Sequence, residues 1–206
     1  MKFLRPFLLL PVFVWLTACT VPILKDEVIE KVDWTEQLRA NNKIQSWVIK
    51  GRIAVQNEDD GAQLDYEWKQ LSPTDYEIRL QAPFGMATAW ISGRAGGVSL
   101  KTSSGDHLSD TDVDRLLLRL YGWPLPVKGL HYWVRGLPSP QSTYTVPQWD
   151  DNGMPMVILQ DGWRIEFRRH TLVSQRFVLP RKVFISRPDE EVEVRLIVRK
   201  WLIEGD

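Results

Sequence analysis

The feature that most constrains the fold is a two-residue alternation of apolar and polar side chains in successive segments. Between residues 47 and 56 the odd positions are apolar or glycine, and the even positions are mostly polar. Residues 62–70 and 76–82 alternate in the same way. This period predicts β-strands with one wet face and one face that is buried or lines a cavity. The turn-rich stretches at 57–61 and 72–75 predict that these strands are sequential and antiparallel.

Helices are expected where the alternation stops. The first covers residues 34–44. The second follows a cap at Ser109 or Thr111, with carboxylates near its positive end, where negative charge is favoured. This helix is amphipathic, with an apolar stripe along one side, and Gly122 and Pro124 are expected to end it.

The positions of the remaining strands determine the expected architecture. Before the second helix, strands are predicted at residues 86–92 and 98–102, and after it at 156–160, 163–168, 182–186 and 192–199. A long sheet of this kind buries its apolar face when it curves and helices lie across its concave side. The expected fold class is therefore α+β, mostly antiparallel β: a half-open curved β-barrel with helices covering the concave face. One such domain is expected over residues 33–206.

The amino terminus resembles a bacterial lipoprotein signal. A short basic start precedes the apolar run at 7–16, which is too short for the roughly 20 residues that span a bilayer. Leu-Thr-Ala-Cys follows at 16–19 and matches the lipobox. We therefore expect residues 1–18 to be a cleaved signal peptide. Residues 19–32 are then a tether lipidated on Cys19, with no other cofactor.

Composition narrows the function further. Cys19 is the single cysteine, so a disulfide or a thiolate metal site is not expected after lipidation. Removing the signal peptide takes away two basic residues and leaves 24 basic against 26 acidic, a charge of about −2 that gives no indication of nucleic-acid binding. Thr20, rather than the aspartate that retains lipoproteins in the inner membrane of enteric-type bacteria, indicates the outer membrane. The protein is expected to be anchored on the periplasmic face of that membrane as a monomer.

An enzymatic function is not indicated. The three histidines, His107, His131 and His170, are far apart and lack metal-ligand spacing. Neither a nucleophile elbow nor a nucleotide-binding loop is present. The carboxylates at 110, 112 and 114 are interpreted as the start of a helix rather than as a metal site. We expect no catalytic residue and no metal ligand.

Two groups of residues are candidates for binding. Apolar positions of the predicted sheet face are candidates for an acyl-chain cavity, although the sequence leaves open which of them are plain core: Trp47, Ile49, Leu64, Tyr66, Trp68, Ile78, Leu80 and Trp90.

The second group is the hairpin tip after the strand that ends near residue 82. Pro83 and Gly85 are turn residues, and between them stands a large apolar side chain, Phe84. We expect Phe84 and Met86 to insert into the membrane. The alternative is that Phe84 folds back as a plug over the sheet edge.

An ordered set of motifs carries a resemblance across nearly all of the expected mature chain. Besides the lipobox, the motifs are Trp47 with Gly51-Arg52-Ile53-Ala54, Tyr66-Glu67-Trp68, Ala82-Pro83-Phe84-Gly85, Gly122-Trp123-Pro124-Leu125-Pro126, Tyr132-Trp133-Val134-Arg135-Gly136-Leu137-Pro138, Leu179-Pro180, and Trp201-Leu202-Ile203. With these motifs the chain resembles the outer-membrane lipoprotein receptor family LolB. Phe84 stands where this family commonly has an exposed leucine, and residues 141–153 match poorly.

The resemblance implies a half-barrel that accepts lipoproteins from the periplasmic carrier LolA and releases them into the outer membrane. The implied partners are LolA, the acyl chains of client lipoproteins and outer-membrane lipids. Two alternatives stay open: a structural envelope lipoprotein, and a lipid-binding lipoprotein with other cargo. Cargo preference and the surface that docks the carrier do not follow from the sequence.

Overall fold

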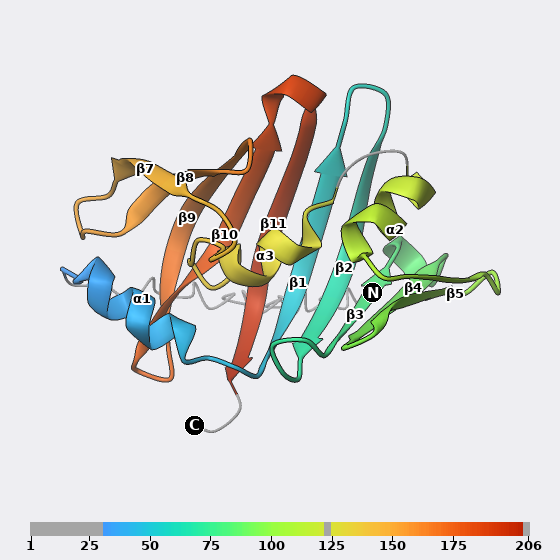
Figure 1. The fold of residues 1–206 in the computed structure, drawn as a ribbon, viewed down its shortest axis with the longest axis horizontal. Helices are drawn as coiled ribbons and strands as arrows, with labels where there is room; N and C mark the ends of the chain where they lie inside the picture. Colours follow the sequence, from blue (N-terminus) through green and yellow to red (C-terminus); the bar gives the residue numbers. More distant parts are fainter. Residues whose placement is uncertain (1–30, 122–124, 204–206) are drawn as a thin grey trace, which may run out of the picture.

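Eleven antiparallel strands form one curved, unclosed sheet in residues 31–121 and 125–203, the parts of the chain that the computed structural model describes. The strand order is β6-β5-β4-β3-β2-β1-β11-β10-β9-β8-β7, so every junction but one joins strands that are neighbours in sequence. Figure 1 shows the helices lying across the concave side of this sheet. The predicted fold class is confirmed.

The strands are β1 (Trp47–Gln56), β2 (Gly61–Gln70), β3 (Tyr76–Gln81), β4 (Thr88–Arg94), β5 (Gly97–Thr102), β6 (His107–Asp110), β7 (Tyr144–Trp149), β8 (Pro155–Gln160), β9 (Trp163–Val173), β10 (Phe177–Arg187) and β11 (Val192–Ile203). The two edge strands, β6 and β7, lack a clear alternation and were not expected as strands. The expected signal peptide, the lipidated cysteine and the helix stop at 122–124 lie outside the described residues.

The junction between β1 and β11 lies in the middle of the sheet and joins its first and last strands in sequence. The strands pair from Trp47 with Ile203 to Gln56 with Glu193, and the register shifts between Lys50 and Gly51. Gly51 is required here, because an added Cβ atom would collide with the carbonyl oxygen of Ile197. A β-bulge of this kind increases the local twist and helps the sheet to curve.

Helix α1 (Trp34–Asn42) packs against β10 on one half of the sheet. The Asp33 side chain caps it by accepting hydrogen bonds from the backbone N–H groups of Thr35 (2.8 Å) and Glu36 (3.3 Å). The buried Asn41 side chain donates to the carbonyl oxygen of Val178 at 3.1 Å.

Helices α2 (Val113–Tyr121) and α3 (Val127–Trp133) form the crossover between the two halves of the sheet. The sequence had suggested Ser109 or Thr111 as the cap of α2, but neither residue caps this helix. The Asp112 carboxylate does so, accepting from the backbone N–H groups of Asp114 at 2.9 Å and Arg115 at 3.2 Å. The cap is displaced because β6 continues to Asp110, which leaves too few residues for an earlier helix start.

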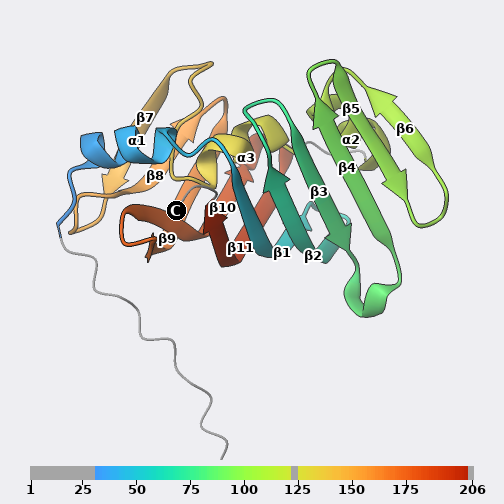
Figure 2. The same ribbon diagram turned by 90° about the horizontal axis from the view of Figure 1, so that it is seen from below.

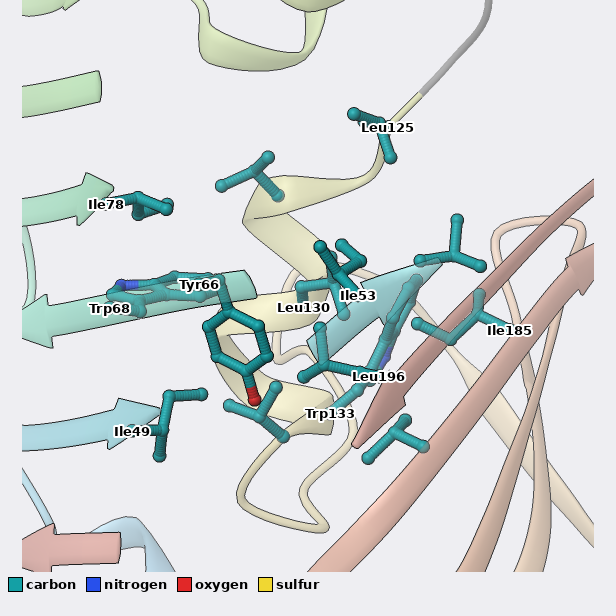
Figure 3. Packing of buried hydrophobic residues seen from close by; sticks show 14 of the residues in the cluster. Ile49, Ile53, Tyr66, Trp68, Ile78, Leu125, Leu130, Trp133, Ile185 and Leu196 are labelled. Carbon is teal, nitrogen blue, oxygen red and sulfur yellow. The ribbon is translucent and has the colours of Figure 1, made fainter. Parts of the chain in front are cut away.

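The core lies between the concave face and α3. Figure 3 shows Leu130 and Trp133 of α3 among side chains from strands on both sides of the β1–β11 junction. Trp133 is 1% exposed, and its indole N–H donates to the side-chain oxygen of the buried Gln160 at 3.0 Å. A buried indole that has a hydrogen-bond acceptor contributes its full apolar area without an unsatisfied donor.

Candidate functional site

A cluster of aromatic rings occupies one end of the concave face. The Trp47 ring is fully buried, and its centroid lies 5.2 Å from that of Trp68 and 5.7 Å from that of Trp201. His131 of α3 lies 6.2 Å from Trp47. These rings form an apolar floor where the helix meets β1 and β2.

A cavity of about 450 Å³ opens beside this cluster, between the β2–β5 part of the sheet and the two crossover helices. Trp68 and Tyr76 line its sheet side, and Val127 and Tyr132 line its helix side. The volume lies within the roughly 300–1,000 Å³ of small-ligand sites. The lining is mainly apolar, with Arg94 and Lys128 among the few charged groups. Such a site suits one apolar chain better than a polar substrate.

Of the eight cavity candidates, the structure places only Trp68 on this cavity. Trp47, Ile49, Tyr66 and Ile78 are buried in the core. Leu64 and Leu80 are partly buried and pack against the same core. The alternation correctly gave the face of these residues, but the position of α3 decides which of them are covered.

The structure corrects the prediction made for Trp90. Its side chain is 43% exposed, and its cross-strand partners, Arg79 and Lys101, belong to the polar outer face. The neighbouring Ile91 is 2% exposed and faces the core opposite Ile78. The prediction that Trp90 lines the cavity is therefore wrong. Two adjacent apolar residues make the face ambiguous, and only the pairing with β3 resolves it.

Several cavity residues were not found by sequence reasoning. Val98 of β5, Val113 of α2, and Val127 and Tyr132 of α3 complete the wall. Val113 had a signal, because it begins the apolar stripe of its helix. Val98 joins the wall through strand pairing, since it lies opposite Gly93 of β4. Val127 and Tyr132 reach the cavity only through the tertiary crossover, which leaves no local pattern.

Polar contacts tie α2 to α3 at the cavity rim. The Asp114 carboxylate accepts from the backbone N–H of Val127 at 2.8 Å and of Lys128 at 3.4 Å, and the Lys128 ammonium pairs with Asp112. Burial raises the pKa of Asp114 to about 6, although these backbone hydrogen bonds oppose the shift. Burial, and then the carboxylates of Asp114 and Asp112, raise the pKa of Tyr76 to about 12.

The other end of α3 is tied to the chain before β1. The Arg135 guanidinium donates from Nη1 to the carbonyl oxygen of Ile44 at 2.9 Å, and from Nε to that of His131 at 3.2 Å. Burial, with a smaller effect of Arg135, lowers the pKa of His131 to about 4, so its ring is neutral at pH 7. Side-chain bonds therefore hold both ends of α3, in addition to the core packing of Leu130 and Trp133.

The tip between β3 and β4 carries the most exposed large apolar residues. Phe84 is 100% exposed and Met86 is 76% exposed. Phe84 (φ 58°) and Gly85 (φ 71°) both have left-handed backbone conformations in the short turn η1 (Pro83–Gly85). Figure 2 shows the connection between β3 and β4 extending beyond the neighbouring strand ends.

This geometry removes the alternative in which Phe84 plugs the sheet edge. A left-handed conformation costs a residue that is not glycine about 1–2 kcal/mol. The fold gains nothing in return, because the ring buries no surface in the monomer. A strained, fully exposed apolar ring indicates a contact with something outside the chain.

The described residues offer no obvious metal site and no spanning helix. In residues 31–121 and 125–203, no group of three or more His, Cys, Asp or Glu side chains is arranged to hold a metal ion. Among the helices of this same part, none is long and apolar enough to cross a membrane.

The sequence matches the family model described as "Outer membrane lipoprotein LolB" over residues 45–201. It is 30% identical over 202 residues to the outer-membrane lipoprotein LolB of Pseudomonas savastanoi pv. phaseolicola, covering 97% of this chain and 96% of the relative. The LolB of Alkalilimnicola ehrlichii is 35% identical over 166 residues, which is 81% of this chain and 80% of the relative.

Solved structures share the fold at low identity. A LolA superfamily protein from Nitrosomonas europaea has a TM-score of 0.54 and 6% identity, covering 85% of this chain and 96% of that one. A putative outer membrane lipoprotein-sorting protein domain from Vibrio parahaemolyticus has a TM-score of 0.52 and 7% identity, covering 83% and 90%. These similarities show that the chain shares its architecture with each of these two proteins.

Proposed function

The chain belongs to the LolB family of outer-membrane lipoproteins, and we propose that it accepts lipidated proteins from the periplasmic carrier LolA and delivers them into the outer membrane. The chain is held there by lipid on Cys19. A lipobox cysteine with three acyl chains anchors a protein stably, since two membrane signals already suffice.

The observation that carries the proposal is the cavity between the sheet and the α2–α3 crossover. Burying an acyl chain of about 16 carbons away from water is favourable by roughly 13 kcal/mol, at about 0.8 kcal/mol per methylene. Such a chain does not cross water unaided on a useful timescale. A receptor must therefore cover the chains at every stage of the transfer.

The cavity is too small for the three acyl chains of a client, so acceptance requires the helical cover to open. The link between α2 and α3 at the cavity rim is suited to this movement, because it consists of individual side-chain bonds from Asp114 and Lys128. Separation of α2 from α3 widens the cavity beside Trp68, while Trp133 keeps α3 in the core. No covalent bond changes during the transfer, so the proposed reaction needs no catalytic residue.

Discharge is assigned to the tip. Inserting the Phe84 ring into lipid contributes roughly 2 kcal/mol. This is too little to anchor the protein, but it is enough to orient a lipidated molecule so that its cavity meets the bilayer. Met86, beside it, adds a flexible apolar side chain.

Depletion of the protein in its native host tests the proposed function. We expect LolA loaded with lipoproteins to accumulate in the periplasm, because its acceptor is missing. A structural envelope lipoprotein, or one with other cargo, would leave the carrier unloaded. Normal lipoprotein sorting after depletion contradicts the proposal.

A further inference from the structure

The outer face of the sheet beside the tip carries an unusual row of side chains. Cross-strand pairing aligns seven residues of seven strands in a single row, which runs Lys200, Lys50, Glu67, Arg79, Trp90, Lys101, His107. Four cations and one carboxylate give this row a net charge of +3 at neutral pH. Like charges that face each other directly, as Lys50 and Lys200 do, destabilise a sheet.

Nearby acids balance this basic charge only in part. Glu67 is already held by Lys50 at 2.6 Å and Lys69 at 3.3 Å, while its distance to Arg79 is 3.8 Å. Within the part of the chain that the structure describes, Lys101 forms no ion pair. Its exposed ammonium is therefore available to a ligand outside the chain, and so is the half-exposed Arg79 guanidinium, whose ion pair with the shared Glu67 is long at 3.8 Å.

Trp90 stands between these two cations and is itself 43% exposed. An exposed tryptophan flanked by basic residues is typical of the boundary between lipid acyl chains and headgroups. The Arg79–Trp90 pair lies two residues from the last β3–β4 pair, Gln81 with Thr88. That is about 7 Å along the strand. The three side chains therefore lie close behind the tip, side by side on the outer face of the sheet.

We propose that Trp90, Arg79 and Lys101 form a second lipid-contact surface, which binds the anionic headgroup layer of the membrane that holds the protein. The tip then enters the acyl region, while this surface rests on the phosphates and sets the tilt of the molecule. Each cation close to an anionic surface raises the membrane-binding constant roughly fivefold. The proposal shares with the discharge role of Phe84 only the direction in which the molecule faces the membrane.

The single native cysteine makes this orientation measurable. Because Cys19 is consumed by lipidation, Ser99→Cys places a unique thiol on the exposed outer face of β5, two residues from Lys101. A fluorophore on this thiol is quenched by lipids that carry a nitroxide on the headgroup. The full lipidated protein is reconstituted in phosphatidylcholine vesicles with and without phosphatidylglycerol. Ser186→Cys, on the outer face of β10, provides the matched control position.

We expect strong quenching at position 99 only with phosphatidylglycerol, and quenching at position 186 close to background. The R79Q/K101Q variant should weaken the contact about 25-fold and bring quenching at 99 to the control level, as should high salt. R168Q/R195Q removes two outer-face cations from the other half of the sheet and should change nothing. Equal quenching at 99 and 186, or quenching unaffected by both anionic lipid and R79Q/K101Q, would overturn the proposal.

A third label separates this proposal from the role of the tip. Met86→Cys reports on the tip and is read with a nitroxide placed deep in the acyl chain. Quenching at 99 without quenching at 86 supports the headgroup surface and contradicts insertion of the tip. Quenching at 86 without quenching at 99 overturns the headgroup surface and leaves the proposed discharge role of Phe84 intact.

Discussion

The two halves of the curved sheet have similar alternating faces, but the helices cover these faces differently. In the β8–β11 half, Ile158, Ile165 and Leu179 are completely buried. In the β2–β6 half, Leu64, Leu80 and Leu108 are only partly buried, and the cavity lies above the neighbouring residues. The difference arises because α1 and Trp133 of α3 pack on the first half. Over the second half, α2 reaches mainly β6 at the rim, and the cavity lies between the strands and the two crossover helices.

This comparison shows how one sheet can serve both as a core and as a binding site. Apolar alternation specifies a face that must leave water, but not what covers it. Where helices pack closely, the face stabilises the fold. Where the helices leave a cavity above the strands, the same kind of face can receive an acyl chain. Substitutions in the two halves should therefore separate stability from binding.

The largest expected effect is on stability in the packed half. Trp133→Ala should lower the free energy of unfolding by about 3–5 kcal/mol, because it leaves a large cavity and removes the hydrogen bond to Gln160. Urea denaturation measures the loss. Trp149→Ala is the control, since this ring is 47% exposed and should cost less than about 1 kcal/mol. Similar losses for both variants would contradict the assignment of Trp133 to the packed core.

A pair of neighbours on β3 sharpens the comparison within one strand. Ile78 is buried in the core, whereas Tyr76 lines the cavity. Ile78→Ala should cost about 2–5 kcal/mol of stability and leave the affinity for a fluorescent fatty acid unchanged. Tyr76→Ala should cost less stability and weaken probe binding about tenfold, a loss of about 1.4 kcal/mol. If the two variants affect probe affinity equally, the cavity is not the binding site.

A smaller effect is expected from Asp114 at the rim. Its folded-state pKa of about 6 lies above the value near 3.9 in an unfolded chain, so the folded state binds the proton more tightly. Stability should therefore fall as pH rises from about 4 to about 6 and stay level above that. Asp114→Asn keeps an acceptor for the Val127 N–H, and should flatten this decline and raise stability at pH 7 by about 1 kcal/mol. An unchanged pH profile in urea melts would contradict the assignment to Asp114.

Local pattern predicted the sheet well because alternation is strong in the long strands. It predicted the extents of β1 and the position of the tip, since Pro83 and Gly85 interrupt two clear runs. It missed β6 because this strand has only four residues, and β7 because most of its side chains are exposed and alternate little. The cap of α2 was misplaced for the same reason, since it depends on where β6 ends.

The candidate site was predictable only in part. The turn residues and the lone aromatic ring predicted that Phe84 is exposed, because those features are local. The cavity depends on the crossover that brings Val127 and Tyr132 over the sheet, and no sequence period records that contact. Trp90 was placed on the wrong face because the number of residues in the tip determines which of two adjacent apolar residues faces inward.

Transfer of cargo by a tip variant tests most directly the claim that acceptance and discharge reside in different regions. Phe84→Glu should fold normally, because the ring buries no surface and glutamate can occupy the same turn. With lipoprotein-loaded LolA and liposomes, this variant should accept cargo at the normal rate and fail to release it, so that loaded receptor accumulates. Phe84→Leu should behave almost like the native protein. Normal release of cargo into liposomes by Phe84→Glu, or failure of this variant to accept cargo while folded, would contradict the account.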